Sequence, residues 1–305
     1  MRLAVTGASG FIGAAVCRAA AEAGWQVYGY GRRPGVDLPG VEYRRWDLND
    51  GALADPPEVD VVLHTAATVT DWGLRAARIL SDVDGLRHVL TTFPGTRLVH
   101  ISSASVYDPS RPTVLANESE APIERYPTEY AASKAAAERL LAGRGDTVIL
   151  RPRAVYGPGD RTVMPRVLSA VRRGTLWIAG AGTHRQSYTS IGNMVSATLL
   201  ACRASATGTY NITDAEPVIL IDALRELLAQ RGQRVRIRHV PVGPATVLAG
   251  TAELAYRAVR SRTPPRLTRY AIGQIAVERT LDLTAARTHL GFRPTSTSFD
   301  GAADW

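Results

Sequence analysis

The sequence has almost no lysine. Lys134 is the single lysine in 305 residues, and all the others of the 36 Lys and Arg side chains are arginine. A lysine in such a chain is a candidate for a role that a planar guanidinium cannot fill, because an ammonium is a compact point charge. Lys134 follows Tyr130 by four positions, and on a helix this spacing places both side chains on one face.

A cation beside a phenol lowers the pKa of the tyrosine from about 10 toward neutral pH. A tyrosine in that state can donate and accept a proton during a reaction, so Tyr130 is a candidate general acid/base. The alternative is an ordinary surface lysine beside a packing tyrosine, and the spacing alone does not decide between the two.

Cysteine is also scarce, and long apolar runs are absent. The two cysteines, Cys17 and Cys202, lie far apart, which argues against a disulfide framework and favours a reducing compartment, the cytoplasm. The chain leads directly into its first apolar strand pattern, so we expect no signal peptide. The apolar stretch 245–259 contains Glu253 and Arg257 and is too short to cross a membrane. We therefore expect no membrane partner.

The formal net charge of +8 does not by itself indicate a nucleic-acid partner. The arginines are dispersed, and the sequence shows neither a basic helix nor an aromatic stacking platform. The charge predicts only a mild attraction for an anionic cofactor or substrate. The six histidines have no metal-ligand spacing with each other or with cysteine, so we expect no metal site.

A glycine-rich turn opens the chain. An apolar strand pattern at 3–6 is followed by Gly7, Gly10 and Gly13, and then by a helical stretch at 14–23. Glycines at a strand-to-helix turn let the backbone approach a pyrophosphate, and the helix N-terminus offers free N–H groups. The alternative is a purely structural turn, but the placement between strand and helix favours dinucleotide binding.

Strand and helix patterns alternate through the first half of the chain. This alternation predicts an α/β fold with a Rossmann-type doubly wound parallel sheet, joined to a smaller, discontinuous carboxyl-terminal substrate domain. We place the dinucleotide-binding domain at 1–160, with segments near 188–212 returning to it, and the substrate domain mainly at 161–305. The predicted strands are 3–6, 27–30, 41–44, 59–64, 97–101, 147–150, a pair near Leu176 and Tyr188, 208–212 and 234–240. The predicted helices are 14–23, 75–93, 130–141, 163–173, 193–203, 220–231 and 245–259.

Five motifs occur in order along the chain. They are Thr-Gly-x-x-Gly-x-x-Gly at 6–13, His-Thr-Ala-Ala at 64–67, Ser-Ser-Ala-Ser-Val-Tyr at 102–107, Tyr-x-x-x-Lys at 130–134 and Arg-Pro-Arg-Ala-Val-Tyr-Gly-Pro at 151–158. With these motifs the sequence resembles the extended short-chain dehydrogenase/reductase family, also called the NAD-dependent epimerase/dehydratase family. The resemblance runs over essentially the whole length.

The resemblance implies a role for each matching residue. Tyr130 would be the general acid/base, Lys134 would hold the nicotinamide ribose and tune Tyr130, and Ser103 would hydrogen-bond the reacting oxygen. The residues that would contact the cofactor are Gly7, Ser9, Gly10, Phe11, Ile12, Gly13, Asp47, Leu48, Thr65, Ala66, Ala67, Pro152 and Val155, together with Tyr130 and Lys134. Asp47 and Leu48 match a pair beside the adenine, although a cap of a loop is an equally good interpretation of Asp47.

The end of the second predicted strand bears on the choice of cofactor. NAD-dependent proteins have an acid there that binds the ribose 2′-OH, whereas this chain has Gly31 followed by Arg32 and Arg33. Guanidinium groups form forked, charge-assisted hydrogen bonds with a phosphate. We therefore predict NADP(H) as the cofactor in preference to NAD.

The reaction class follows from departures within the motifs. Relatives that dehydrate nucleotide sugars have Thr-Asp-Glu where this chain has Ser-Ala-Ser at 103–105. Relatives that bind nucleotide sugars usually have an asparagine at the position of Ala154 and often an aspartate at the position of Asn193. The chain looks closer to 3β-hydroxysteroid dehydrogenases and bacterial β-keto acid reductases, also through Trp72-Gly73 and the stretch 264–270.

We therefore predict an enzyme that reduces a ketone of a small, largely hydrophobic molecule, or oxidises the alcohol. The alternatives are a nucleotide-sugar epimerase or 4-ketoreductase, and a non-catalytic NADP-binding protein. Apolar residues of 248–256 and 267–275 would line the substrate site, although arginines 151, 153, 161 and 185 could instead bind a carboxylate or phosphate. The family also implies a homodimer, formed by the helix at 130–141 and the helix before it.

Overall fold

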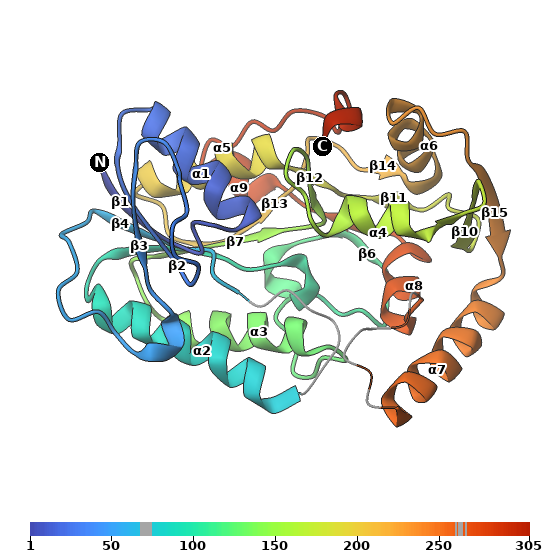
Figure 1. The fold of residues 1–305 in the computed structure, drawn as a ribbon, viewed down its shortest axis with the longest axis horizontal. Coiled ribbons are helices and arrows are strands. Elements are labelled where there is room, and N and C mark those ends of the chain that lie inside the picture. Colours follow the sequence, from blue (N-terminus) through green and yellow to red (C-terminus); the bar gives the residue numbers. More distant parts are fainter. Residues whose placement is uncertain (68–74, 260, 262–264, 266) are drawn as a thin grey trace.

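The computed structural model describes residues 1–67, 75–259, 261, 265 and 267–305. Its centre is a seven-stranded sheet with the strand order β13-β7-β5-β4-β1-β2-β3, in which every neighbouring pair is parallel (Figure 1). The strands are β1 Arg2–Thr6, β2 Gln26–Gly31, β3 Val41–Arg45, β4 Val61–His64, β5 Arg97–Ile101, β7 Thr147–Pro152 and β13 Gly208–Ile212.

Helices cover both faces of this sheet. In Figure 1, α1 (Phe11–Glu22) and α5 (Ile191–Arg203) lie on one side, and α2 (Arg75–Thr92) and α3 (Glu129–Leu141) lie on the other. The strands β4 and β7 are buried at every position, as expected for parallel strands that pack on both faces. The architecture is therefore doubly wound, as the alternation of patterns predicted.

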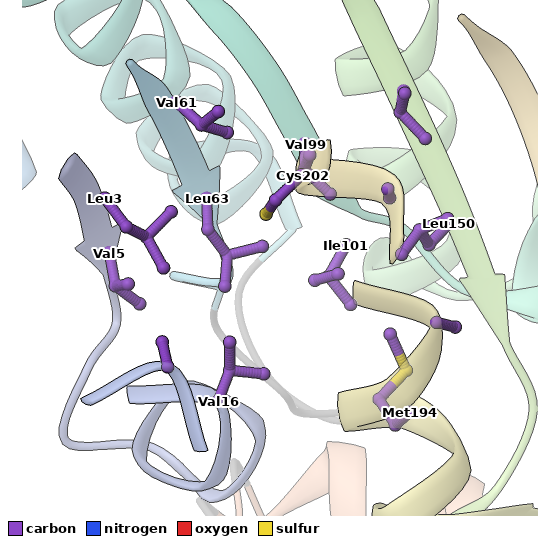
Figure 2. Close-up of a cluster of buried hydrophobic side chains, with 14 of the residues drawn as sticks. Leu3, Val5, Val16, Val61, Leu63, Val99, Ile101, Leu150, Met194 and Cys202 are labelled. Atoms are coloured by element: carbon purple, nitrogen blue, oxygen red, sulfur yellow. The ribbon is translucent and has the colours of Figure 1, made fainter. Parts of the chain in front are cut away.

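Two apolar cores hold the layers together. On one face, strand side chains pack against α1 and α5, and Figure 2 shows Leu3, Val5, Leu63 and Ile101 of the strands around Val16 of α1 and Met194 of α5. On the other face, strand residues such as Val62 and Leu98 pack against α2 and α3. Successive strand residues point to opposite faces, so β1, β2, β4, β5 and β7 each contribute to both cores.

The second half of the chain builds smaller sheets and helices beside the carboxyl ends of the central strands (Figure 1). Its helices are α4 Val163–Ala170, α6 Leu220–Gln230, α7 Val242–Ala258 and α8 Arg269–Ile275. The short helix α9 Thr284–His289 packs instead against β13 of the central sheet. The strands outside the central sheet are β6 Thr113–Ala116, β8 Val155–Tyr156, β9 Val171–Arg172, β10 Thr175–Ala179, β11 Arg185–Gln186, β12 Thr189–Ser190, β14 Val218–Ile219, β15 Arg236–Val240 and β16 Arg279–Leu281. No helix of the described residues is both long enough and apolar enough to cross a membrane.

The fold class predicted from the sequence is confirmed, and most predicted elements form. The strand pair near Leu176 and Tyr188 is wrong, because β10 pairs with β9 and β15, and Tyr188 lies between β11 and β12 of two other sheets. In the segment 248–256, which the sequence predicted to line the substrate site, Leu248 and Leu254 on α7 are 65% and 70% exposed, and this role stays a prediction. Trp72, Gly73 and part of 264–270 lie outside the described residues.

Candidate functional site

The turn between β1 and α1 is packed too tightly for side chains. Gly7 has a φ of +76°, and a Cβ there would lie 2.6 Å from Thr65 Oγ1 and 2.7 Å from the Ala66 nitrogen. A Cβ on Gly13 would lie 2.3 Å from the Gly7 carbonyl oxygen. These two glycines therefore let the turn pack directly against the loop that follows β4.

The N-terminus of α1 has no side-chain cap. Gly10 is the N-cap residue with an extended backbone, and no side chain in the described part of the chain caps the first turn. The free N–H groups and the positive end of the helix dipole form a site for phosphate groups. Phe11, Ile12 and Gly13 form the first turn of this helix.

An open cleft of about 390 Å³ lies in front of this helix end. Ten of the residues predicted to contact the cofactor line it: Gly7, Ser9, Gly10, Arg32, Arg33, Asp47, Leu48, Thr65, Ala66 and Ala67. The sequence analysis missed further lining residues, among them Tyr30, Trp46, Asn49, Asp82 and Gly85. Trp46 directly precedes Asp47 and Tyr30 lies two residues before Arg32, so the motif neighbourhood could have suggested them. The uncapped helix end and the open cleft fit a dinucleotide.

The last residue of β2, Gly31, stands where NAD-binding sites have an acid. A Cβ on Gly31 would lie 2.5 Å from the Tyr43 hydroxyl oxygen, and this hydroxyl is held by donating to the Arg33 carbonyl at 2.8 Å. The Arg33 guanidinium donates to the Ser9 carbonyl at 2.6 Å. The positive charge of Arg33 therefore lies beside the glycine turn, in the region where NAD-binding proteins have a carboxylate.

Asp47 performs the capping role that the sequence left open, and it also lines the cleft. Its carboxylate caps the short helix Leu48–Asp50 by accepting from the Asn49 backbone nitrogen at 3.0 Å and from Asn49 Nδ2 at 2.9 Å. A capped turn fixes this carboxylate at the rim of the cleft.

Tyr130 and Lys134 lie on α3, which begins after the N-cap residue Thr128. The Lys134 ammonium is buried and donates to the Ile101 carbonyl at the end of β5, at 2.6 Å. Burial lowers the pKa of Lys134 to about 8, whereas the nearby carboxylates of Asp82 and Glu138 act in the opposite direction. The site is thus matched to a small cation that can change its protonation near working pH.

The three serines after β5 have different environments. Ser103 Oγ accepts a hydrogen bond from the Ser105 nitrogen at 3.1 Å, which leaves the Ser103 hydroxyl proton free to donate. Ser102 is buried and donates to Glu138 instead. Ser105 Oγ is buried without a partner among the described residues. Of the three hydroxyls, that of Ser103 is the one suited to a reacting oxygen.

A buried ion pair ties α3 to the sheet. Arg151 at the end of β7 donates to Glu138 through Nε at 3.0 Å and Nη2 at 2.6 Å, and both side chains are at most 4% exposed. Arg151 also donates to the Tyr107 hydroxyl at 3.3 Å. Glu138 is one helical turn beyond Lys134, so this pair fixes the helix that carries the candidate catalytic residues.

Two histidines lie at the ends of β4 and β5, on the side of α3. The rings of His64 and His100 stack with centroids 5.3 Å apart, and both are buried. Burial, assisted by the charge of Lys134, lowers the pKa of His64 to about 3 and that of His100 well below its usual value. Both rings are therefore neutral at physiological pH. No group of His, Cys, Asp or Glu in the described part of the chain is arranged to hold a metal ion.

The segment after β7 runs from Pro152 at the strand end to Val155 in β8. Ala154 between them has a φ of +47°, a conformation that Asn adopts more readily than Ala. Asn193 donates to Asp214 Oδ1 at 2.7 Å and to the Thr295 carbonyl at 2.9 Å, so its amide is committed to the fold. Neither position offers a polar group to a nucleotide sugar.

Comparisons with known proteins agree with this site. The family model "NAD dependent epimerase/dehydratase family" matches residues 3–213. The chain is 31% identical to a 2-alkyl-3-oxoalkanoate reductase of Stenotrophomonas maltophilia, over 96% of this chain and 95% of that protein. It is also 31% identical to a 4-hydroxy-2-methyl-3-oxo-4-farnesyl-3,4-dihydroquinoline-1-oxide ketoreductase of Stigmatella aurantiaca, over 96% and 92% of the two chains.

The solved structure of MoeE5 in complex with UDP-glucose and NAD has a similar fold. Its TM-score is 0.70 at 25% identity, and the match covers 100% of this chain and 97% of the other. The family that the motifs predicted is thus confirmed by the family model and by relatives that match almost the whole length. The chain belongs to the NAD dependent epimerase/dehydratase family.

Proposed function

We propose that this protein is an NADP(H)-dependent reductase of ketones, with a small and largely hydrophobic substrate. The observation that carries the proposal is the placement of Ser103, Tyr130 and Lys134 at the carboxyl ends of the central strands, where open α/β sheets bind their ligands. Reductases among the relatives support it.

Each residue of the set has a task in carbonyl reduction. When bound, the nicotinamide cofactor supplies the hydride that the carbonyl carbon accepts. Ser103 donates a hydrogen bond from its hydroxyl to the substrate oxygen and so orients the carbonyl. Tyr130 donates a proton to the oxygen as negative charge develops there, and the ammonium of Lys134, one helical turn away, favours the resulting phenolate.

A nucleotide-sugar epimerase or 4-ketoreductase is the second candidate, because the family includes epimerases. Two observations count against it. The Asn193 amide is already hydrogen-bonded within the fold, and Ala154 has no polar side chain to offer a nucleotide sugar. The deciding experiment incubates the protein and NADPH with apolar ketones, β-keto acids and nucleotide sugars. It follows the loss of NADPH absorbance for reduction, and it separates the sugar products by chromatography because epimerisation consumes no NADPH overall. Turnover of a nucleotide sugar, with the apolar ketones inert, would overturn our proposal in favour of the second candidate.

The cofactor preference depends on Arg32 and Arg33. We expect Arg32→Ala and Arg33→Ala each to weaken NADPH binding by about 1.5–3 kcal/mol, the range for hydrogen bonds to a charged group. NADH has no 2′-phosphate, so its affinity should change little. Titration of both cofactors into both variants measures this difference, and an equal loss for NADH and NADPH would restore NAD as the cofactor.

We also propose a homodimer that forms through α2 and α3. Ala132, Ala136 and Leu140 lie at i, i+4 and i+8 on α3 and are half-buried, so a partner helix could approach closely along this stripe. Light scattering at micromolar protein should give twice the mass of the chain. A monomer mass there contradicts the proposal, and Ala136→Glu should produce it if α3 forms the interface.

We expect the enzyme to act on a free small molecule in the cytoplasm. Cys17 and Cys202 are free and buried, and burial raises the pKa of both thiols to about 12. Thiols in this state remain protonated and unreactive, which suits a compartment where disulfides do not form.

A further inference from the structure

The four arginines that the sequence singled out have different environments. Arg151 is neutralised by Glu138, and Arg161 and Arg185 are exposed. Arg153 is half-buried, and no carboxylate of the described residues forms an ion pair with it. It is therefore the one of the four that combines a recessed position with an unneutralised charge.

Both the backbone and the guanidinium of Arg153 are held by hydrogen bonds. Its backbone nitrogen donates to Thr189 Oγ1 at 3.0 Å, and its carbonyl accepts from the same hydroxyl at 2.9 Å. Its guanidinium donates to the Ser187 carbonyl at 2.7 Å, to Gln186 Oε1 at 2.6 Å and to the Gln274 carbonyl at 3.3 Å. All three acceptors are neutral. Nε and the second hydrogen of Nη1 make no hydrogen bond to the described residues, so two donors are free.

A second cation adds to the positive charge in this region. Burial lowers the pKa of Arg153 to about 10, and the charge of Arg279 acts in the same direction. Arg279 is buried and donates to four backbone carbonyls, those of Asp108, Pro109, Arg111 and Gly273. Charges removed from water are normally paired with an opposite charge. The Asp108 carboxylate acts on Arg279 but not on Arg153, so a bound anion would supply the charge that Arg153 lacks.

The position of Arg153 indicates where this anion would come from. Arg153 directly follows Pro152, in the segment that the family resemblance aligns with the nicotinamide, and its guanidinium reaches Gln274 on α8. It thus joins the nucleotide-binding sheet to the part of the chain expected to hold the substrate. An anionic group bound there would belong to the molecule whose carbonyl is reduced.

We propose that Arg153 binds the carboxylate of a keto acid and so selects acids over neutral ketones; this inference rests on the proposed reductase function. Arginine suits the task because its planar donors match the two oxygens of a carboxylate. Arg153 then binds the substrate while Gln186 and the Ser187 carbonyl fix the orientation of its guanidinium.

The first test compares 3-oxodecanoate with its neutral methyl ester, in the wild type and in Arg153→Gln. We expect kcat/KM for the acid to fall about 10- to 100-fold, as for the loss of a hydrogen bond to a charged group, and kcat/KM for the ester to stay within about twofold. The exposed Arg185→Gln is the matched control and should leave both substrates unchanged. Activity on the ester shows that the variant is folded.

A second test does not need turnover. Decanoate is titrated calorimetrically into wild type and Arg153→Gln, each saturated with NADP⁺, and we expect affinity to fall by about the same 10- to 100-fold. Equal loss of kcat/KM for acid and ester, or unchanged decanoate affinity, overturns the role of Arg153. If the wild type reduces neither ketone, the reductase proposal fails instead, and the calorimetry alone decides on Arg153.

Discussion

Tyr130→Phe is expected to lower kcat by about 10²–10⁴, the usual effect of losing a general acid, with little change in cofactor affinity. The change removes one oxygen from α3 and leaves the ring in place, so the helix and the Lys134 contact with the Ile101 carbonyl should persist. The measurement is the turnover of an active ketone at saturating NADPH, with cofactor affinity determined separately by titration.

Tyr28→Phe is the matched control, because the Tyr28 hydroxyl accepts from Gln26 at the start of β2, away from the cleft. This control should keep full activity. If Tyr130→Phe also kept most of its turnover, Tyr130 would not be the proton donor, and α3 would not carry the general acid of the reaction.

Lys134→Arg should also be severe, although it preserves the charge. Lys134 is 5% exposed, and its ammonium donates to the Ile101 carbonyl at the end of β5. A guanidinium is larger and planar, and it cannot make the same single contact. Near-full activity of Lys134→Arg would remove the argument drawn from the scarcity of lysine. Arg139→Lys, at an exposed position of the same helix, tests for any general effect of exchanging these residues.

Local patterns explain why so much of the fold was predictable. The central strands are short apolar segments between helical stretches, and β5 and β13 form at the predicted residues. The glycine turn is equally local, because its spacing is set by the contact between Gly7 and Gly13. Such features depend on near neighbours in the chain, so sequence patterns report them.

The missed elements depend on distant partners. β6 pairs with β16, and Thr113 lies opposite Arg279, more than half the chain away. Strands of three or four residues carry too little pattern to be recognised without their partners.

The candidate site shows the same division. Its motif residues were found from spacing. The Tyr43 hydroxyl, which a Cβ on Gly31 would approach closely, comes instead from the neighbouring strand β3. The pairing of Glu138 with Arg151 also joins two separate elements. Glu138 lies four residues after Lys134, so helical spacing could have indicated that it shares the face of α3 turned to the sheet.

Glu138→Gln is expected to destabilise the protein by about 3–5 kcal/mol, because it leaves the Arg151 guanidinium buried without a counter-charge. Arg151 is 2% exposed and would keep only uncharged acceptors, the Tyr107 hydroxyl and the carbonyls of Glu118 and Ala121. The measurement is the free energy of unfolding from urea titration, followed by circular dichroism.

Two comparisons make the Glu138 result specific. Glu58→Gln removes a surface partner of Arg2 whose side chain is 89% exposed, and it should cost less than about 1 kcal/mol. Glu138→Gln/Arg151→Met removes both charges and should recover part of the lost stability, because no buried charge then remains unpaired. Equal stability of Glu138→Gln and Glu58→Gln would show that the pair does not hold α3 against the sheet. Lys134 and Tyr130 would then owe their placement to the apolar contacts of α3 with the sheet and α2, which include Ala137 and Leu141.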